Sequence, residues 1–466
     1  MHLRRTDIAI LAGTTTLAAA VLAVWLYLIP PPNVEARLAR EPDRTQQREA
    51  PGPEESPTGT LVAGEGQPSA IGGSWPQFRG TDRSNIVHQA PDLTESWPEG
   101  GLPVVWEQQM GPGHAGPAVR DGVVYVADYD VEEHKDVIRA LSLESGEEIW
   151  RHSYYSKVKR VHGSSRTVPA VSGEFVVAIG PKANVYCLRA DTGEQVWRMK
   201  MVEEFGTEVP PWYAGQCPLI EDGKVILAPG GDPLMMAVEL ETGEILWKTP
   251  NPGGWGMTHS SITPMDYRGS RRYIYCTTRG VVGVDAEDGR LLWTEPDWKI
   301  ALATVPSPVV VGEDRIFFSG GYNSGCMMLR LTGEGADIQP ETDWKLGPRT
   351  FGAEQQTPIL YGDHIYGVIP SGELACLDLE GNRLWTSGKK NRFELGPFLL
   401  ADGLLLVLHG QEGVLNLVRA RPESYEPLDS TPVIEGHDIW GPMAMVEDLL
   451  LLRDMDTLKC LRLPTK

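Results

Sequence analysis

The chain has 466 residues, which is too many for one ordinary compact domain with a single core. Its 51 glycines and 37 prolines exceed the usual shares of roughly 7% and 5%, and its 41% hydrophobic content excludes disorder throughout. A net charge of −21 disfavours general binding to nucleic-acid phosphates.

An apolar run of 22 residues, 8–29, stands near the N-terminus and contains no charge. It is long enough to cross a bilayer as a helix, and Arg4 and Arg5 before it place the N-terminus in the cytoplasm. A cleaved signal peptide is the alternative, although its apolar part should span about 7–15 residues and end at a small-x-small site. We therefore expect residues 1–29 to be a retained signal-anchor, which places the rest of the chain on the periplasmic side of the cell membrane.

Residues 30–73 hold eight prolines among many Glu, Arg, Gly and Ser residues and show no hydrophobic period. This composition predicts a flexible, partly extended linker. The N-terminal region contains no cysteine, so it offers no site for the acylation that anchors a lipoprotein.

From residue 74 onward one phrase recurs, in which a glycine precedes a tryptophan by four residues. The copies lie at 144–150, 191–197, 241–247, 287–293 and 379–385. With Trp344 in a stretched copy and Trp106 in an isolated one, seven of the 14 tryptophans share one position, 41–51 residues apart. Two alternating apolar runs precede each phrase and meet at turns such as Asp121-Gly122, where glycine accepts the positive φ of a tight hairpin. Four antiparallel strands in about 45 residues predict a β-propeller blade.

The repeat units number eight. They begin near the prolines at positions 117, 169, 218, 264, 308, 358, 397 and 442. The last unit stops after three strands, and the isolated run 103–110 would supply its fourth strand and close the ring. Seven blades with one irregular unit is the alternative, because unit seven lacks its tryptophan. The predicted fold of residues 74–466 is all-β: an eight-bladed propeller of four-stranded antiparallel blades, closed by an N-terminal strand.

The phrase at 190–197, which follows Val185-Tyr186-Cys187-Leu188, resembles the PQQ-like, quinoprotein-type propeller repeat. The tract 75–80 resembles the leading segment of exported bacterial members, and the resemblance covers about residues 74–466. It implies that the repeated tryptophans dock one blade on the next. These structural residues would be Trp106, Trp150, Trp197, Trp247, Trp293, Trp344 and Trp385.

Two branches of this family imply different functions. Quinoprotein dehydrogenases oxidise alcohols or sugars with PQQ and calcium, and soluble alcohol-oxidising members carry adjacent cysteines over the cofactor. None of the six cysteines here is adjacent to another, and no Cys-x-x-Cys-His haem site occurs. The other branch is non-catalytic and is similar to the propeller lipoproteins of the outer-membrane β-barrel assembly machinery, from which this chain departs in its anchor and linker.

The cysteines and acidic residues suggest neither disulfides nor a metal site. Cys187, Cys376 and Cys460 share one position in the third strand, and such positions in different blades are too far apart to bond. We predict free, buried thiols rather than disulfides. The acidic loop 128–136 lacks the Gly and Glu that an EF-hand needs at positions six and twelve. No catalytic motif occurs either, so we assign no metal ligand and no catalytic residue.

The segments that lead into the first strand of each unit are rich in aromatic and charged residues. Because they share one place in the repeat, a propeller gathers them at the mouth of its central channel. The candidate ligand-binding residues are His114, His162, Arg166, Trp212, Trp255, His259, Glu354, Gln355, Glu394 and Trp440. Arg166 suits a carboxylate, as in a quinone acid or a peptide end, and Trp212 or Trp440 would stack on the rings of PQQ if it binds. The alternative is that these groups plug the channel by bonding to one another.

We expect a monomeric, membrane-anchored, exported propeller that binds or scaffolds an envelope protein, a peptide or a small ligand, without nucleic acid and without catalysis. The alternative is a PQQ-dependent dehydrogenase that uses PQQ and calcium to oxidise an alcohol or a sugar.

Overall fold

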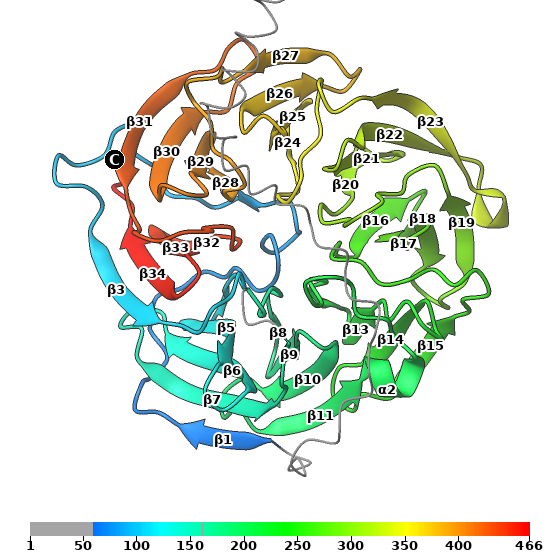
Figure 1. Cartoon of the computed structure of the whole chain (residues 1–466), viewed down its shortest axis with the longest axis horizontal. Coiled ribbons are helices and arrows are strands. Elements are labelled where there is room, and N and C mark those ends of the chain that lie inside the picture. The colour runs from blue at the N-terminus through cyan, green and yellow to red at the C-terminus, as the bar shows by residue number, and fades with distance from the viewer. Residues whose placement is uncertain (1–58, 160–162) are drawn as a thin grey trace, which may run out of the picture. The chain divides into compact units, whose positions relative to one another are not determined.

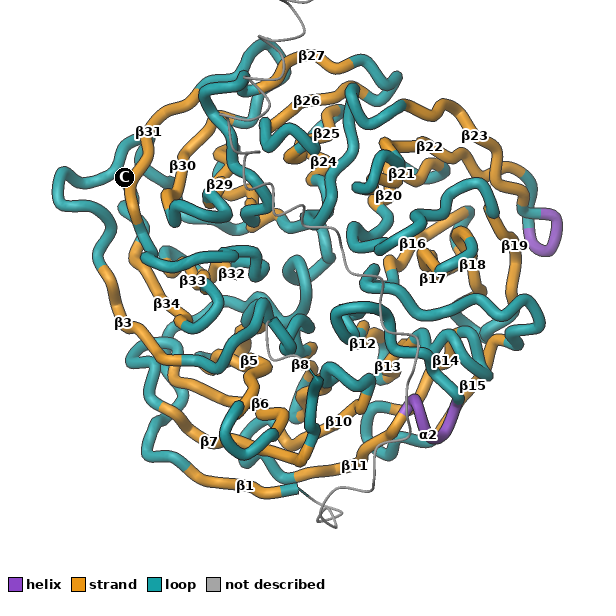
Figure 2. Tube along the Cα trace, viewed as in Figure 1, coloured by secondary structure: helices purple, strands orange, loops and turns teal. Residues whose placement is uncertain are grey.

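The computed structural model describes residues 59–159 and 163–466, which belong to one compact unit of the chain, Glu55–Lys466. These residues form eight sheets set in a ring, each built on four antiparallel strands (Figure 1). Each sheet is a blade whose first strand lies near the centre of the ring, and loops that return from the outer strand to the centre join successive blades (Figure 2). The expected anchor at residues 1–29 lies outside the described residues. Within the described part, no helix is long and apolar enough to cross a membrane.

The strands of the first four blades follow, from the first strand outward. Blade 1 comprises β4 (Ala118–Arg120), β5 (Val123–Asp130), β6 (Lys135–Ser142) and β7 (Glu148–Tyr155). Blade 2 comprises β8 (Ala170–Ser172), β9 (Phe175–Ile179), β10 (Asn184–Arg189) and β11 (Gln195–Lys200), followed by the short helix α2 (Met201–Phe205). Blade 3 comprises β12 (Leu219–Glu221), β13 (Lys224–Leu227), β14 (Met235–Glu239) and β15 (Ile245–Thr249). Blade 4 comprises β16 (Thr263–Tyr267), β17 (Ser270–Thr277), β18 (Gly280–Asp285) and β19 (Leu291–Glu295).

The other four blades repeat this order. Blade 5 comprises β20 (Val309–Val311), β21 (Arg315–Gly320), β22 (Gly325–Thr332), the 3-10 helix η1 (Gly335–Asp337) and β23 (Gln339–Leu346). Blade 6 comprises β24 (Ile359–Tyr361), β25 (His364–Val368), β26 (Leu374–Asp378) and β27 (Arg383–Thr386). Blade 7 comprises β28 (Phe398–Ala401), β29 (Leu404–Leu408), β30 (Val414–Arg419) and β31 (Pro427–Pro432). Blade 8 comprises β32 (Ala444–Val446), β33 (Leu449–Arg453), β34 (Thr457–Arg462) and β3 (Val104–Gln109).

The eight predicted units are confirmed, and each first strand begins within two residues of its predicted proline. The closure is confirmed as well, because β3 pairs with β34 and sets Trp106 opposite Cys460. The seven-blade alternative is therefore wrong. Closing the ring in this way pairs the last blade with a strand from the other end of the fold.

The hydrophobic core lies between neighbouring blades. One cluster joins Tyr125 and Trp150 of blade 1 to Val176 and Tyr186 of blade 2, and all four side chains are buried. Strands with apolar residues on both faces suit such a stack, since each sheet is covered on two sides. All six cysteines are buried in these layers, and none is bonded to another.

The repeated tryptophans contact the next blade along the chain. Six indole N–H groups donate to a backbone carbonyl there at 2.8–3.3 Å: Trp106 to Leu143, Trp150 to Ala190, Trp197 to Leu240, Trp247 to Ala286, Trp344 to Leu379 and Trp385 to Arg421. The repeated glycine of the next blade lies against the same ring; a Cβ on Gly243 would lie 2.8 Å from Cγ of Trp197. Trp293 differs: its N–H has no hydrogen-bond partner among the described residues, and η1 lies in the corresponding turn of the next blade.

Part of the expected linker is ordered, contrary to our expectation. The structure describes its residues 59–73, of which β1 (Thr60–Ala63) pairs with the outer strand β7 and makes blade 1 five-stranded. The Ser69 N–H donates to Gly122 O at 3.0 Å. The open edge of an outer strand offers backbone partners even to a segment without a hydrophobic period, which is why composition did not reveal this pairing.

Candidate functional site

The central channel is occupied by residues 75–87, which we call the channel segment (Figure 1, blue). Trp75 exchanges two backbone hydrogen bonds of 2.8 Å with Val119 of blade 1, and the Val171 N–H of blade 2 donates to Pro76 O. At its other end, β2 (Ile86–Val87) runs parallel to β28 of blade 7. Sequence reasoning identified 75–80 as a leading segment but did not place it here.

Two buried arginines tie the channel segment to the first strands. Arg79 donates to Thr357 O at 2.6 Å and Pro358 O at 2.9 Å, at the start of blade 6. Arg83 donates to Ile262 O at 2.9 Å, before blade 4, and to Pro218 O at 3.1 Å, before blade 3. Burial lowers the pKa of Arg79 to about 9 and that of Arg83 to about 10, so both stay charged at neutral pH.

A belt of side chains joins blades 2 to 6 just before their first strands. Each backbone N–H in it donates to a side chain at the corresponding position of the next blade. The pairs are Val168 to Cys217 Sγ (3.2 Å), Cys217 to Ser261 Oγ (3.0 Å), Ser261 to Ser307 Oγ (3.0 Å) and Ser307 to Thr357 Oγ1 (2.9 Å). Cys217 thus serves as a hydrogen-bonding member of the belt.

The loops into the first strands and the hairpins between second and third strands share one end of the channel, which we call the mouth, because successive strands run in opposite directions. Arg166 lies there, in the loop between β7 and β8. Its Nε is buried without a hydrogen bond, and no described residue forms an ion pair with it. Burial lowers its pKa to about 10, and the phenols of Tyr213 and Tyr322 are the groups that oppose this fall.

His259 and Trp212 adjoin Arg166. Burial, and then the charge of Arg166, lower the pKa of His259 to about 4, against a hydrogen bond with the backbone of Pro211, so the imidazole is neutral at pH 7. The rings of Trp212 and His259 lie 6.4 Å apart. Trp212 and Tyr213 adopt φ values of 63° and 75°, a conformation that bulky residues rarely adopt, and the Trp212 side chain stays 41% exposed.

A second aromatic pair, His114 and Trp440, lies near Arg166. His114 stacks on Trp440, with ring centroids 5.0 Å apart and an interplanar angle of 25°. A Cβ on Gly163 would lie 2.4 Å from Nε2 of His114 and 3.1 Å from Nη2 of Arg166, so the imidazole and the guanidinium are neighbours. The Trp440 indole N–H is buried without a hydrogen-bond partner among the described residues.

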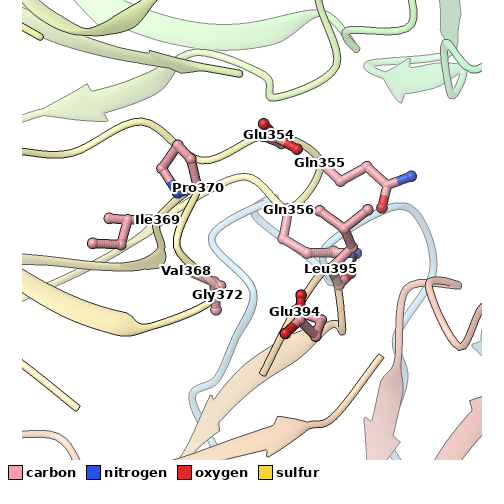
Figure 3. A pocket seen from close by; sticks show the side chains of 9 residues that line it. All are labelled: Glu354, Gln355, Gln356, Val368, Ile369, Pro370, Gly372, Glu394 and Leu395. Atoms are coloured by element: carbon pink, nitrogen blue, oxygen red, sulfur yellow. Dashed lines mark hydrogen bonds between the residues drawn. The ribbon is translucent and has the colours of Figure 1, made fainter. Parts of the chain in front are cut away.

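Two glutamates line a cavity of about 170 Å³ between blades 6 and 7 (Figure 3). Glu354 and Gln355 come from the loop before β24, and Glu394 comes from the loop before β28. Burial raises the pKa of Glu354, although the Tyr322 N–H donates to its carboxylate. Gln355 Oε1 is buried without a partner in the described part of the chain. The cavity is smaller than the roughly 300 Å³ of a typical small-molecule pocket.

The ten predicted site residues therefore fall into two groups at the mouth, with two exceptions. Arg166 has His114 and His259 near it, with Trp440 stacked on His114 and Trp212 beside His259, while Glu354, Gln355 and Glu394 line the cavity. Trp255 is placed elsewhere: its N–H donates to Asn251 Oδ1 at 2.9 Å, and its ring packs on the core between blades 3 and 4. His162 lies outside the described residues. Sequence reasoning missed Tyr322, which reaches the mouth from the hairpin between β21 and β22.

The residues of the mouth do not fit PQQ with calcium. Arg166 could hold one carboxylate of the quinone, but the described residues include no group of three His, Cys, Asp or Glu side chains placed to hold a metal ion. Calcium prefers six to eight oxygen ligands, and the small cavity at the mouth is lined by only two carboxylates, those of Glu354 and Glu394. We therefore derive no chemical step through this cofactor.

Comparison with known proteins gives a family and a fold. The sequence model of the outer membrane protein assembly factor BamB family matches residues 134–415. The Yersinia pestis outer membrane protein assembly factor BamB is 24% identical over 342 residues, covering 67% of this chain and 77% of that protein. Quinohemoprotein alcohol dehydrogenase from Comamonas testosteroni superposes with a TM-score of 0.59 at 14% identity, over 84% of this chain and 81% of its own. The computationally designed Ika8 protein superposes with a TM-score of 0.52 at 11% identity, over 80% and 100%. At these identities the two structures establish the fold alone.

Proposed function

Because the chain belongs to the family of the outer membrane protein assembly factor BamB, we propose that it is a non-catalytic scaffold for other envelope proteins during the assembly of outer-membrane proteins. In this proposal residues 1–29 anchor a monomer in the inner membrane, and the propeller lies on the periplasmic side. The mouth is the end that receives a partner.

The channel segment is the observation that carries this proposal. It bonds to the first strands of blades 1 and 2 and, through its arginines, to the residues before the first strands of blades 3, 4 and 6. Quinoprotein-type catalysis needs a cofactor and its metal held at the centre of the propeller, and here the centre holds the chain's own backbone and two arginines that donate to backbone carbonyls. What is left for partners is the outer surface and the mouth, where Trp212 is exposed.

Site-directed photocrosslinking in intact envelopes tests the scaffold role. We expect a photoreactive residue at position 212 to capture a protein of the outer-membrane assembly machinery. Position 246 is the matched control, because Leu246 is 49% exposed but lies in the outer strand β15. Capture at 246 alone would move the partner from the mouth to the blade edge and so contradict the placement at the mouth.

An enzymatic assay tests the same proposal from the other side. Purified protein incubated with PQQ and calcium chloride is expected to leave a redox dye unchanged in the presence of ethanol or glucose. Dye reduction that requires PQQ, together with no captured protein at either position, would overturn the scaffold proposal.

A further inference from the structure

Arg166, which is half-buried with its Nε shielded from solvent, differs in its partners from the buried arginines of the propeller. The guanidinium groups of Arg79, Arg83 and Arg453 donate to backbone carbonyls. Arg453, for example, donates to Gly111 O at 3.0 Å and to Met455 O at 3.1 Å. Arg272 pairs with Asp285 at 2.9 Å. No carbonyl or carboxylate of a described residue bonds to Arg166.

Even a half-buried charge loses part of its hydration, and proteins normally give such a charge a partner or neutralise it. This chain has 63 acidic residues available, yet none of those described pairs with Arg166. A guanidinium remains charged at neutral pH, so neutralisation is not open to it. The missing partner is therefore expected to come from another molecule.

The geometry points to a carboxylate-binding site at the mouth, in which Arg166 receives the two oxygens of the ligand's carboxylate. A guanidinium fork matches two coplanar oxygens, and one cation balances one negative charge. The other groups around it, Tyr213, Tyr322 and the neutral His259, are hydrogen-bonding and carry no positive charge. A phosphate dianion would call for more cations than the single guanidinium that lies among these groups.

The exposed indole of Trp212 defines the rest of the ligand. Two consecutive bulky residues with positive φ hold this ring at the mouth, and such strain persists where the surrounding structure enforces it. An apolar or aromatic group next to the carboxylate can pack on the indole. The ligand class is thus a carboxylic acid with a neighbouring apolar group, either a peptide C-terminus or a free acid. This inference rests on the proposed function, which makes the mouth the receiving end.

Calorimetric titration of the full chain tests the site, with N-acetylphenylalanine and its C-terminal amide as probes. We expect the acid to bind about tenfold or more tightly than the amide, and Arg166→Gln to remove that difference. Arg166→Lys keeps the positive charge but lacks the planar guanidinium, so it should reduce the preference for the acid less than Arg166→Gln does. Arg120→Gln is the matched control, because Arg120 lies at the end of β4 away from the mouth and should leave binding unchanged.

A thermal melt separates this role from a structural one. Because Arg166 has no partner among the described residues, Arg166→Gln should raise Tm, whereas a structural arginine would lower it on removal. Equal binding of acid and amide, or a lowered Tm with unchanged affinity in Arg166→Gln, would overturn the site. Tighter binding of inorganic phosphate than of the acid would overturn the carboxylate assignment.

The two sources of the carboxylate are distinguished by a tetrapeptide that ends in phenylalanine. Tighter binding than that of N-acetylphenylalanine identifies a chain end, and equal binding identifies a free acid. If neither N-acetylphenylalanine nor the tetrapeptide binds, while a photoreactive residue at position 212 still captures a partner protein, the carboxylate site is refuted and the scaffold proposal stands.

Discussion

Asp136 in β6 is 4% exposed, and burial raises its pKa to about 7, although the nearby Tyr154, Ser156 and Lys182 hold the rise back. The folded protein therefore binds this proton more tightly than the unfolded chain, whose aspartate has a pKa near 3.9. The stability that Asp136 contributes is complete below pH 4 and is lost as pH rises through 7, at about 1.4 kcal/mol per unit.

Asp136→Asn should remove this loss. We expect the variant to match the wild type at pH 4 and to exceed its stability by a few kcal/mol at pH 8, as measured by urea unfolding. Asp121→Asn is the control, because the Asp121 side chain is 83% exposed. A variant that is less stable than the wild type at pH 8 would mean that the carboxylate is needed in its charged form.

His259 has the opposite effect on the pH dependence of stability. Its folded pKa of about 4 lies below the unfolded value near 6.5, so only the unfolded chain takes up the proton between these values. Stability is therefore lost as pH falls from 6.5 to 4. His259→Gln should flatten this part of the pH profile of Tm, and an unchanged slope would show that the imidazole titrates normally.

Repeat position identified Arg166 and His259 from the sequence, because both precede first strands. It could not identify Tyr322, which belongs to a different loop of its blade and reaches the mouth because both loops end at the same side of the ring. Nor could it show that Trp255, which shares the repeat position, bonds to Asn251 and packs against the core between blades 3 and 4.

At the scale of elements, the repeated glycine adopts a positive φ and also leaves room for the tryptophan of the preceding blade, and two substitutions separate these roles. Gly243 and Gly223 have φ values of 75° and 71°, so alanine at either position strains the backbone. A Cβ at Gly243 also meets Trp197, whereas a Cβ at Gly223 meets nothing within 4 Å.

We expect Gly223→Ala to lower the free energy of unfolding by about 1 kcal/mol and Gly243→Ala to lower it by more, because Trp197 must move. Denaturant unfolding measures both. Equal losses would mean that the contact between the glycine and the indole adds nothing to the docking of blades.

The blades themselves could be predicted because each repeats a pattern that the sequence displays eight times. The channel segment could not, because it occurs once and its partners are remote: Arg79 bonds to a residue 278 positions away. A single-copy contact leaves no period in the sequence. For the same reason, β1 was hidden in a stretch with the composition of a linker.

At the scale of the whole molecule, the channel segment links blades that are not neighbours. Arg79 makes hydrogen bonds to four carbonyls, two within the segment and two at the start of blade 6. Arg79→Met should leave these buried carbonyls without donors and lower the stability of the whole ring by about 3–5 kcal/mol. Arg120→Met is the exposed control, and equal unfolding midpoints for the two variants would contradict a role of Arg79 in holding the ring.

The docking contacts and the channel segment have different consequences for how many blades the ring can hold. Every repeat carries its own tryptophan and glycine, so a duplicated or deleted repeat would regenerate its contacts with both neighbours, whatever the total. The channel segment meets partners at fixed places around the axis. Arg79 and Arg83 donate to carbonyls before the first strands of blades 3, 4 and 6, and the side-chain amide of Asn85 donates to Phe398 O in the first strand of blade 7. A wider or narrower ring would move those carbonyls out of reach of Arg79, Arg83 and Asn85. The number of blades is therefore fixed at the centre of the molecule, by residues that belong to no repeat.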